Sequence, residues 1–272
     1  MNAARHALIT GGSSGIGLAS ARLLAAQGWR ISLIARGRER LEAATSALRS
    51  SSGDPAAANS YPADVADRQQ CARAVGAAIA AAGAPDLLLA CAGTVRPGYF
   101  EAIPYADFER AMAVNYFGVL HTAHAALPAM RARGSGHVIF VSSGAGLIGV
   151  FGYSAYAPSK FAVRGLAEVL RAELRPAGIR VSVVYPPDTD TPQLAEENRL
   201  KPAETCAITA RGGLMSADQV AREIVRAIDR DEFTIAPGSA MRLLAAWHSP
   251  LARILRWSLD RTARQAARRL PV

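Results

Sequence analysis

A chain of 272 residues, 50% of them hydrophobic and 19% charged, has enough apolar material for a sizeable core and too little charge for a disordered protein. No run of about 18 uncharged apolar residues is present, so we expect no helix that spans a membrane. Seven arginines and one aspartate give residues 241–272 a charge of +6, which leaves +3 of the total +9 for the other 240 residues. The body of the protein is therefore nearly neutral, and we expect no nucleic-acid partner.

The three cysteines, Cys71, Cys91 and Cys206, are odd in number and have no metal-ligand spacing. We interpret them as free thiols of a protein in a reducing compartment, with no metal site. The N-terminus runs directly into the apolar residues 7–10 without a charged and then apolar leader. We therefore expect no signal peptide and a cytoplasmic location.

The first predicted strand, residues 7–10, is followed by a glycine-rich turn at 11–17 and a helix over 18–27. By itself a cluster of Gly and Ser is most often a loop. Between a strand and a helix it is typical of a turn that lays a diphosphate on the helix N-terminus. The candidate cofactor-binding residues here are Gly11, Ser13, Ser14, Gly15, Ile16 and Gly17.

The second predicted strand, Arg30 to Ala35, ends without the carboxylate that would bind the ribose 2′-hydroxyl of NAD. Arg36 follows it directly and Arg40 lies one helical turn further on, so guanidinium groups are available for a 2′-phosphate. The alternative is an ordinary basic helix start, which the helix dipole disfavours. The sequence thus predicts NADPH as the cofactor.

The third and fourth predicted strands end in further candidates. The third strand ends with Asp64 and Val65, where Asp64 is suited to accept a bond from the adenine amino group. Its alternative role is to cap the helix over residues 68–82, which Asp67 can perform equally well. The fourth strand, residues 86–90, leads into Ala92 and Gly93, whose small size permits a nicotinamide ribose to approach the backbone.

Candidate catalytic residues lie in the middle of the chain. Tyr156 and Lys160 stand four apart and share one face of a helix, where an ammonium favours the phenolate and eases proton transfer. Ser143 follows the apolar strand 138–141 and can bind the same substrate oxygen, although Ser142 is adjacent. The alternative is a turn Ser, a core Tyr and a surface Lys.

A predicted helix over residues 105–131 contains Asn115. The side chain of Asn competes with the helix for backbone hydrogen bonds, so an Asn inside an apolar helix suggests a specific role. Positioning a water or the backbone is one such role. Asn115 is accordingly a fourth catalytic candidate.

The remaining pattern is a strand over 179–184, a long polar connection to about Gly213, a helix over 217–230 and a strand over 233–236. A connection of this length is a candidate lid. The alternation of strands and helices predicts an α/β fold, a single doubly wound Rossmann-type domain over residues 1–237 with a seven-stranded parallel sheet. Its site is expected at the carboxyl ends of the strands.

Residues 238–272 predict a basic amphipathic helical extension, called the C-terminal tail below. Ser249 and Pro250 are suited to begin its helix. Met241, Leu244 and Trp247 form an apolar stripe upstream. Apolar residues gather on one side of the predicted helix, namely Leu251, Leu255 and Leu259 with Ile254 beside them, and Arg253, Arg256, Arg264 and Arg268 gather opposite. Peripheral contact with a membrane and packing on the domain or a second subunit are both compatible with this pattern.

Over roughly residues 5–237 the chain resembles the short-chain dehydrogenase/reductases. The resemblance rests on Thr10-Gly11-x-x-x-Gly15-x-Gly17, Cys91-Ala92-Gly93, Asn115, Ser143, Tyr156-x-x-x-Lys160 and Pro186…Thr191, in family order and spacing. It implies that Tyr156 is the acid/base on the carbonyl oxygen. Lys160 would lower the pKa of Tyr156 and bind the nicotinamide ribose.

The same resemblance implies that Ser143 holds the substrate oxygen, that Asn115 anchors a water of a proton relay, and that Thr191 meets the nicotinamide carboxamide. Pro186 and Thr191 thereby join the cofactor candidates. The chain departs from the usual pattern at Cys91, where the family has Asn, and at Pro187, where it has Gly.

Both departures belong to a subgroup that the chain resembles, the 3-ketodihydrosphingosine (3-dehydrosphinganine) reductases. This likeness also rests on residues 151–156, 185–192, 195–199 and 201–202. It implies NADPH-dependent reduction of a long-chain lipid ketone to sphinganine, in a protein that forms dimers or tetramers. The alternatives are reduction of another hydrophobic ketone, fatty or steroid-like, and a non-catalytic NADP-binding protein at a membrane.

Overall fold

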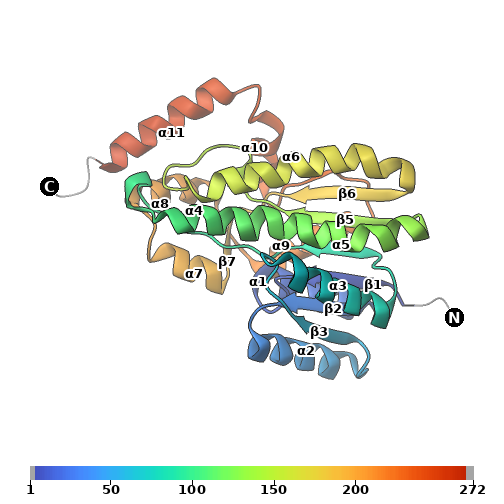
Figure 1. Cartoon of the computed structure of the whole chain (residues 1–272). Coiled ribbons are helices and arrows are strands. Elements are labelled where there is room, and N and C mark those ends of the chain that lie inside the picture. Colours follow the sequence, from blue (N-terminus) through green and yellow to red (C-terminus); the bar gives the residue numbers. More distant parts are fainter. Residues whose placement is uncertain (1–3, 268–272) are drawn as a thin grey trace.

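The computed structural model of the chain describes residues 4–267. Its centre is a seven-stranded parallel sheet, as the sequence predicts (Figure 1). The strands lie in the order β3-β2-β1-β4-β5-β6-β9. The strands are β1 His6–Thr10, β2 Arg30–Ala35, β3 Ala58–Pro62, β4 Leu87–Ala90, β5 Gly136–Val141, β6 Ile179–Val184 and β9 Thr234–Ile235. The strand order reverses between β1 and β4, and a ligand crevice is expected outside the carboxyl ends of the strands at such a point.

Helices cover both faces of this sheet. One face is covered by α3 (Arg68–Ala82), α5 (Gly118–Arg133) and α6 (Tyr156–Leu174), and the other by α1 (Gly15–Ala25), α2 (Arg38–Ser52) and α9 (Ala217–Ile228). Short helical turns at Phe100–Ala102, Gly144–Gly146 and Arg175–Ala177 connect these elements. The arrangement is the doubly wound Rossmann-type fold.

Burial on both faces explains the unbroken apolar runs of the strands. In β5, Val138 and Phe140 pack into the core on one side of the sheet, whereas Ile139 and Val141 pack into the core on the other. Side chains of a strand alternate between faces, so a strand covered on both faces needs apolar residues at every position. This burial holds the end of β5, and the serines that follow it, in a rigid position.

The predicted helix over residues 105–131 is interrupted. It consists of α4 (Tyr105–Ala111), a π-helical turn at Met112–Phe117 and α5. Asn115 lies in the π-helical turn and bonds to groups outside its own helix, to the backbone of Thr94 and to the hydroxyl of Ser159. A local widening of the helix accommodates these bonds, and such turns are frequent at functional sites.

The long polar connection is more regular than the sequence analysis expected. It contains β7 (Asp188–Asp190), α7 (Pro192–Asn198), α8 (Ala203–Thr209), a helical turn at Ala210–Gly212 and β8 (Leu214–Ser216). Strands β7 and β8 pair in parallel as a separate small sheet. Elements of three to seven residues are too short to show a hydrophobic period, which is why the sequence did not predict them.

The C-terminal tail forms two helices, α10 (Ser239–Trp247) and α11 (Ala252–Ala267). The predicted start at Ser249 and Pro250 is wrong by two residues, because the amide of Leu251 donates to the carbonyl of Trp247 and closes a turn on α10. Helix α11 packs against α8 (Figure 1). Arg268 lies outside the described residues.

Other predicted boundaries shift slightly. Helix α1 begins at Gly15 rather than Leu18, β3 ends before Asp64, and α9 ends at Ile228 rather than Arg230. Within residues 4–267, no helix has both the length and the apolar character needed to cross a bilayer.

Candidate active site

A cavity of about 720 Å³ opens at the carboxyl edge of the sheet. It brings together most of the residues that the sequence singled out. Those that line it are Gly11, Ser14, Gly15, Ile16, Ala92, Gly93, Ser143, Tyr156, Lys160, Pro186 and Thr191. The predicted residues Ser13, Gly17, Arg36, Arg40, Asp64, Val65 and Asn115 do not line it.

Two serines follow β5, and their hydroxyls differ in role. The hydroxyl of Ser142 is buried and donates to the backbone carbonyl of Lys160 over 2.9 Å. The hydroxyl of Ser143 accepts a bond from the amide of Ala145 over 3.2 Å. It also lowers the pKa of the Tyr156 phenol. Ser142 therefore fastens α6 to β5, and Ser143 is the hydroxyl that lies beside Tyr156.

Lys160 lies one turn after Tyr156 on α6, and only 4% of it is exposed. Its ammonium donates to the carbonyl of Val141 over 3.0 Å and lies 5.5 Å from the centre of the Tyr156 ring. Burial lowers the pKa of Lys160 from 10.5 to about 8, against a smaller opposing effect of Cys91. A Cβ placed on Gly93 would lie 3.6 Å from this ammonium, so Gly93 lies directly beside Lys160.

The pKa of Tyr156 shifts in the direction opposite to the one we expected from the spacing. Burial raises it, the carboxylate of Glu197 raises it further, and the hydroxyl of Ser143 lowers it. The expectation neglected the burial of the phenol and the carboxylate that packs beside it. Tyr156 is thus a protonated phenol at neutral pH, which suits a proton donor.

Asn115 is fully buried and positions its neighbours. Its amide donates to the carbonyl of Thr94 and to the hydroxyl of Ser159, each over 2.9 Å, and its carbonyl accepts from the amide of Thr94 over 2.8 Å. Ser159 immediately precedes Lys160. Asn115 therefore connects the loop after β4 to the turn of α6 that carries the lysine.

The N-terminus of α1 fits a diphosphate. Ser14 is its N-cap residue but makes no capping bond, no acidic residue occupies the first turn, and Ser14, Gly15 and Ile16 line the cavity. Unpaired amides at the positive end of a helix are suited to bind phosphate oxygens. Gly11 has φ of +68°, and a side chain there would meet the backbone of Ala92 at 2.9 Å.

The adenosine end of the expected cofactor site lies beyond β2 and β3. Arg36 and Asp64 lie 3.9 Å apart, with 56% and 32% of their side chains exposed. Asp67 caps α3 by accepting bonds from the amides of Gln69 and Gln70, so Asp64 is not needed as its cap. Arg36 remains accessible at the point where a 2′-phosphate is expected.

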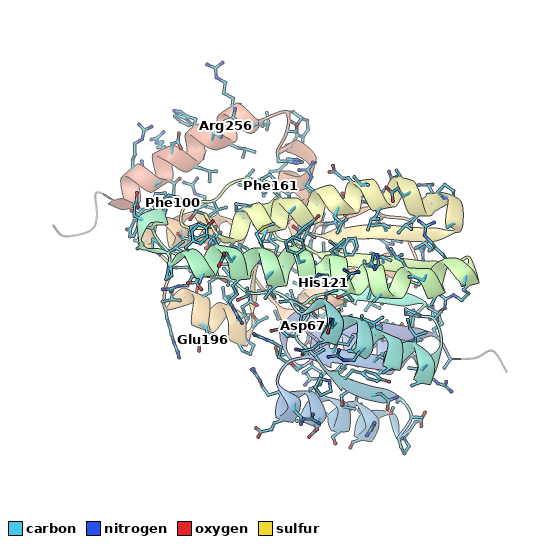
Figure 2. All side chains as sticks on the ribbon, viewed as in Figure 1. Asp67, Phe100, His121, Phe161, Glu196 and Arg256 are labelled. Atoms are coloured by element: carbon cyan, nitrogen blue, oxygen red, sulfur yellow. The ribbon has the colours of Figure 1, made fainter. Side chains whose placement is uncertain are left out.

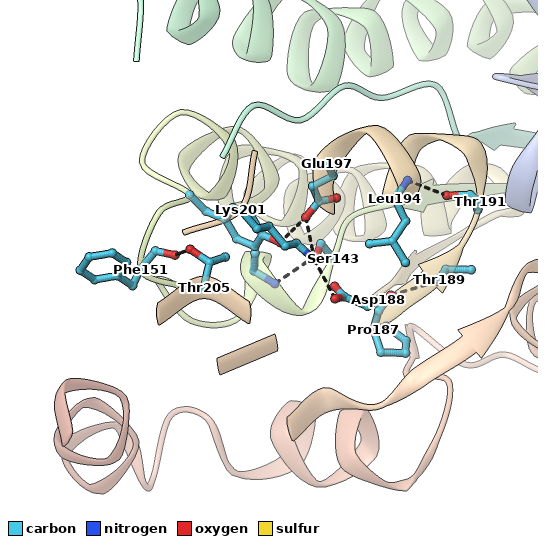
Figure 3. A network of polar contacts seen from close by, with 12 residues as sticks. Ser143, Phe151, Pro187, Asp188, Thr189, Thr191, Leu194, Glu197, Lys201 and Thr205 are labelled. Atoms are coloured by element: carbon cyan, nitrogen blue, oxygen red, sulfur yellow. Dashed lines mark hydrogen bonds and ion pairs between the residues drawn. The ribbon is translucent and has the colours of Figure 1, made fainter. Parts of the chain in front are cut away.

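Four residues of the site were not predicted as such: Tyr153, Asp188, Glu197 and Lys201. The hydroxyl of Tyr153 donates to Glu197, and the ammonium of Lys201 lies 2.8 Å from Asp188 and 3.1 Å from Glu197 (Figure 3). Tyr153, Asp188 and Glu197 line the cavity. The four-residue spacing of Glu197 and Lys201 was a signal for their ion pair, but nothing in the sequence places Asp188 beside them.

The C-terminal tail forms part of the cavity wall. Leu244, Trp247, Leu251, Leu255 and Leu259 all line it. The predicted apolar side of the tail helix thus faces the cavity, as the packing alternative expects. Ile254 and Trp257 are directed elsewhere, with 60% and 61% of each residue exposed.

The chain has relatives among known proteins. Residues 5–201 match the family described as short chain dehydrogenase. The chain belongs to the short-chain dehydrogenase family. It is also similar to proteins named 3-ketodihydrosphingosine reductase from Mus musculus, at 40% identity over 89% of this chain and 73% of that one, and from Dictyostelium discoideum, at 39% over 89% and 77%. A Danio rerio protein named 3-dehydrosphinganine reductase is 41% identical over 89% and 73%.

Solved structures of the family share the fold. A short-chain dehydrogenase/reductase from Burkholderia phymatum in complex with NAD superposes with a TM-score of 0.81, at 26% identity over 93% of this chain and 95% of that one. Levodione reductase superposes with a TM-score of 0.77, at 29% identity over 85% and 94%.

Proposed function

We propose that this short-chain dehydrogenase reduces 3-ketodihydrosphingosine to sphinganine with NADPH. The observation that carries the proposal is that Ser143, Tyr156 and Lys160 together line a cavity whose walls are largely apolar. The names of the relatives support the substrate. A long-chain ketone fits such a cavity, with its carbonyl beside these three residues and its alkyl chain along the apolar walls.

Each residue of the site has a part in the reaction. Bound NADPH would supply the hydride to the carbonyl carbon. Ser143 and Tyr156 bind and orient the carbonyl oxygen, and Tyr156, which burial keeps protonated, delivers its proton to that oxygen. The Lys160 ammonium offsets negative charge that develops on the phenol oxygen. Asn115 keeps the turn that carries Lys160 in place.

Preference for NADPH over NADH rests on Arg36 and Arg40. No carboxylate ends β2, and both guanidinium groups lie at its carboxyl end. Asp64, which follows β3, lies 3.9 Å from Arg36. A 2′-phosphate would be held by charge-assisted hydrogen bonds from the arginines.

The test is consumption of NADPH by the purified chain with a panel of ketones. The panel contains 3-ketodihydrosphingosine, a long-chain fatty ketone and a steroid ketone. We expect the highest kcat/KM with 3-ketodihydrosphingosine. A higher value with another ketone would assign a different substrate, and no turnover with any ketone despite NADPH binding would favour a non-catalytic protein.

We also propose that the outer side of α11 contacts an anionic membrane. Exposed Ile254 and Trp257 alternate there with exposed arginines at 253, 256 and 264, and Figure 2 shows the helix that carries Arg256 at the outer edge of the molecule. A Trp and an Ile among arginines are typical of an interfacial helix, and each surface Arg contributes about 1 kcal/mol to attraction by anionic lipid at low salt.

Liposome co-sedimentation tests this contact. The full chain should pellet with vesicles that contain anionic lipid, less so at high salt, and the variant Ile254→Asp/Trp257→Asp should stay in the supernatant. Equal pelleting of the two proteins would contradict the proposal and leave α11 as a packing element only.

A further inference from the structure

The acidic residues of the cavity lie beside the catalytic tyrosine. Asp188 and Glu197 are the two carboxylates among the described residues that line the cavity. Glu197 accepts the bond from Tyr153, whose ring lies 5.4 Å from that of Tyr156, centre to centre. The effect of Glu197 on the pKa of Tyr156 is second only to that of burial. A carbonyl bound at Tyr156 would therefore have these carboxylates close to its neighbouring atoms.

The two carboxylates are not fully neutralised by the protein. They share the single ammonium of Lys201, of whose side chain only 1% is exposed. Lys201 binds Oδ2 of Asp188 and Oε1 of Glu197. Among residues 4–267, no protein group donates a hydrogen bond to Oδ1 of Asp188 or to Oε2 of Glu197. Each carboxylate thus keeps one oxygen for a further donor, and ionised together with Lys201 the group has a charge of −1.

Other cationic side chains that line the cavity do not neutralise the remaining negative charge of Asp188, Glu197 and Lys201. The ammonium of Lys160 donates to the carbonyl of Val141 and forms no ion pair with either carboxylate among the described residues. Arg211 donates to Ser258 of α11 at the cavity rim. Burial raises the pKa of Glu197, against the opposing effects of Tyr153 and Lys201, and the neighbouring Asp188 raises it further.

The proposed substrate has the missing charge in the required place. In 3-ketodihydrosphingosine an ammonium is attached to the carbon next to the carbonyl, and a hydroxyl to the carbon after it. We propose that Glu197, together with Asp188, binds the substrate's α-ammonium and thereby selects amino ketones over plain long-chain ketones. This inference rests on the proposed function and adds to it the residues that bind the amine of the substrate.

A purely structural role is the competing explanation. Asp188 precedes α7, Glu197 lies within it and Lys201 follows it, so the ion pairs also fasten the lid segment. A structural role would change the turnover of every ketone in the same proportion. Binding of the ammonium would change the turnover of ketones that have it by a larger factor than the turnover of ketones that lack it.

The experiment compares wild type with Glu197→Gln, which keeps the size of the side chain and its ability to accept a bond from Tyr153. Both proteins are assayed with 3-ketodihydrosphingosine and with its deamino analogue, in which hydrogen replaces the ammonium. The matched control is Glu196→Gln on the same helix, because Glu196 pairs with Arg199 and 69% of its side chain is exposed. NADPH binding by each variant is measured as a check on folding.

We expect Glu197→Gln to lower kcat/KM for the amino ketone at least ten times more than kcat/KM for the deamino analogue, whose own change reports the effect of Glu197 on Tyr156. Glu196→Gln should match wild type on both. An equal loss on both ketones, or no loss on the amino ketone, would overturn the inference while the proposed function stands. If wild type reduces the deamino analogue but not 3-ketodihydrosphingosine, both are overturned. If Glu197→Gln does not fold, Asp188→Asn in the same comparison decides.

Discussion

The ammonium of Lys160 lies 5.5 Å from the centre of the Tyr156 ring and is held there by a bond to the carbonyl of Val141. The lysine is thus anchored to the end of β5 rather than to the phenol. Ser142 fastens the same turn of α6 through the backbone carbonyl of Lys160. The distance between tyrosine and lysine is therefore set by the sheet.

Tyr156→Phe removes the proposed proton donor and nothing else. We expect kcat to fall by about 10²–10⁴, because this is the usual contribution of a general acid. NADPH binding should change little, since the ring remains. The measurement is ketone-dependent oxidation of NADPH. Tyr105→Phe serves as the control because Tyr105 is 78% exposed on α4. Turnover of Tyr156→Phe at the wild-type rate would assign the proton to another group.

Lys160→Met tests the burial of the ammonium. The pKa of about 8 in the folded protein lies below the ordinary 10.5, so between these pH values the unfolded chain binds more protons. The free energy of unfolding should therefore rise with pH across this window by up to about 3 kcal/mol in wild type, and this contribution should be absent in the variant. At neutral pH the variant should be the more stable protein and nearly inactive.

The measurement is urea unfolding at a series of pH values without cofactor. The difference between wild type and Lys160→Met isolates the lysine from other titrating groups. A difference that does not change between pH 8 and 10.5 would show that the ammonium is not destabilised by its site.

Cofactor preference should move when the end of β2 is changed. Ala35→Asp/Arg36→Ala places a carboxylate near the ribose and removes a guanidinium. We expect kcat/KM for NADPH to fall at least tenfold while that for NADH stays equal or rises. Arg22→Ala, an exposed arginine on α1, is the control for loss of a positive charge. If the ratio of kcat/KM for NADPH to kcat/KM for NADH did not change, Arg40 and Ser13 would be the residues that bind the 2′-phosphate.

The tail should contribute to binding of the substrate's alkyl chain. Leu255 lines the cavity, and Leu255→Asp places a charge in its apolar wall. We expect KM for a long-chain ketone to rise about tenfold or more, equivalent to about 1.4 kcal/mol, with little change for a short ketone. Ile254→Asp is the matched control, because 60% of Ile254 is exposed. Equal effects of the two substitutions on KM would show that α11 does not bind the alkyl chain of the substrate.

Local sequence patterns determined the secondary structure of this protein and the spacing of several site residues. The strand, glycine-rich turn and helix at residues 7–27, the apolar runs of the strands and the spacing of Tyr156 and Lys160 each lie within a few turns of chain. Such patterns follow from backbone geometry and periodicity, which the sequence contains directly. The alternation of strands and helices then predicts a parallel sheet that is covered on both faces.

Only the tertiary structure decided what depends on distant segments meeting. The raised pKa of Tyr156 comes from burial and from Glu197, which is 41 residues away in the sequence (197 − 156). The pairing of Asp188 with Glu197 through Lys201 requires the segment from β7 to the end of α7 to fold back on itself. The side of α11 that faces the cavity depends on its packing against α8. Burial and electrostatic fields are sums over neighbours in space, and spacing along the chain does not report them.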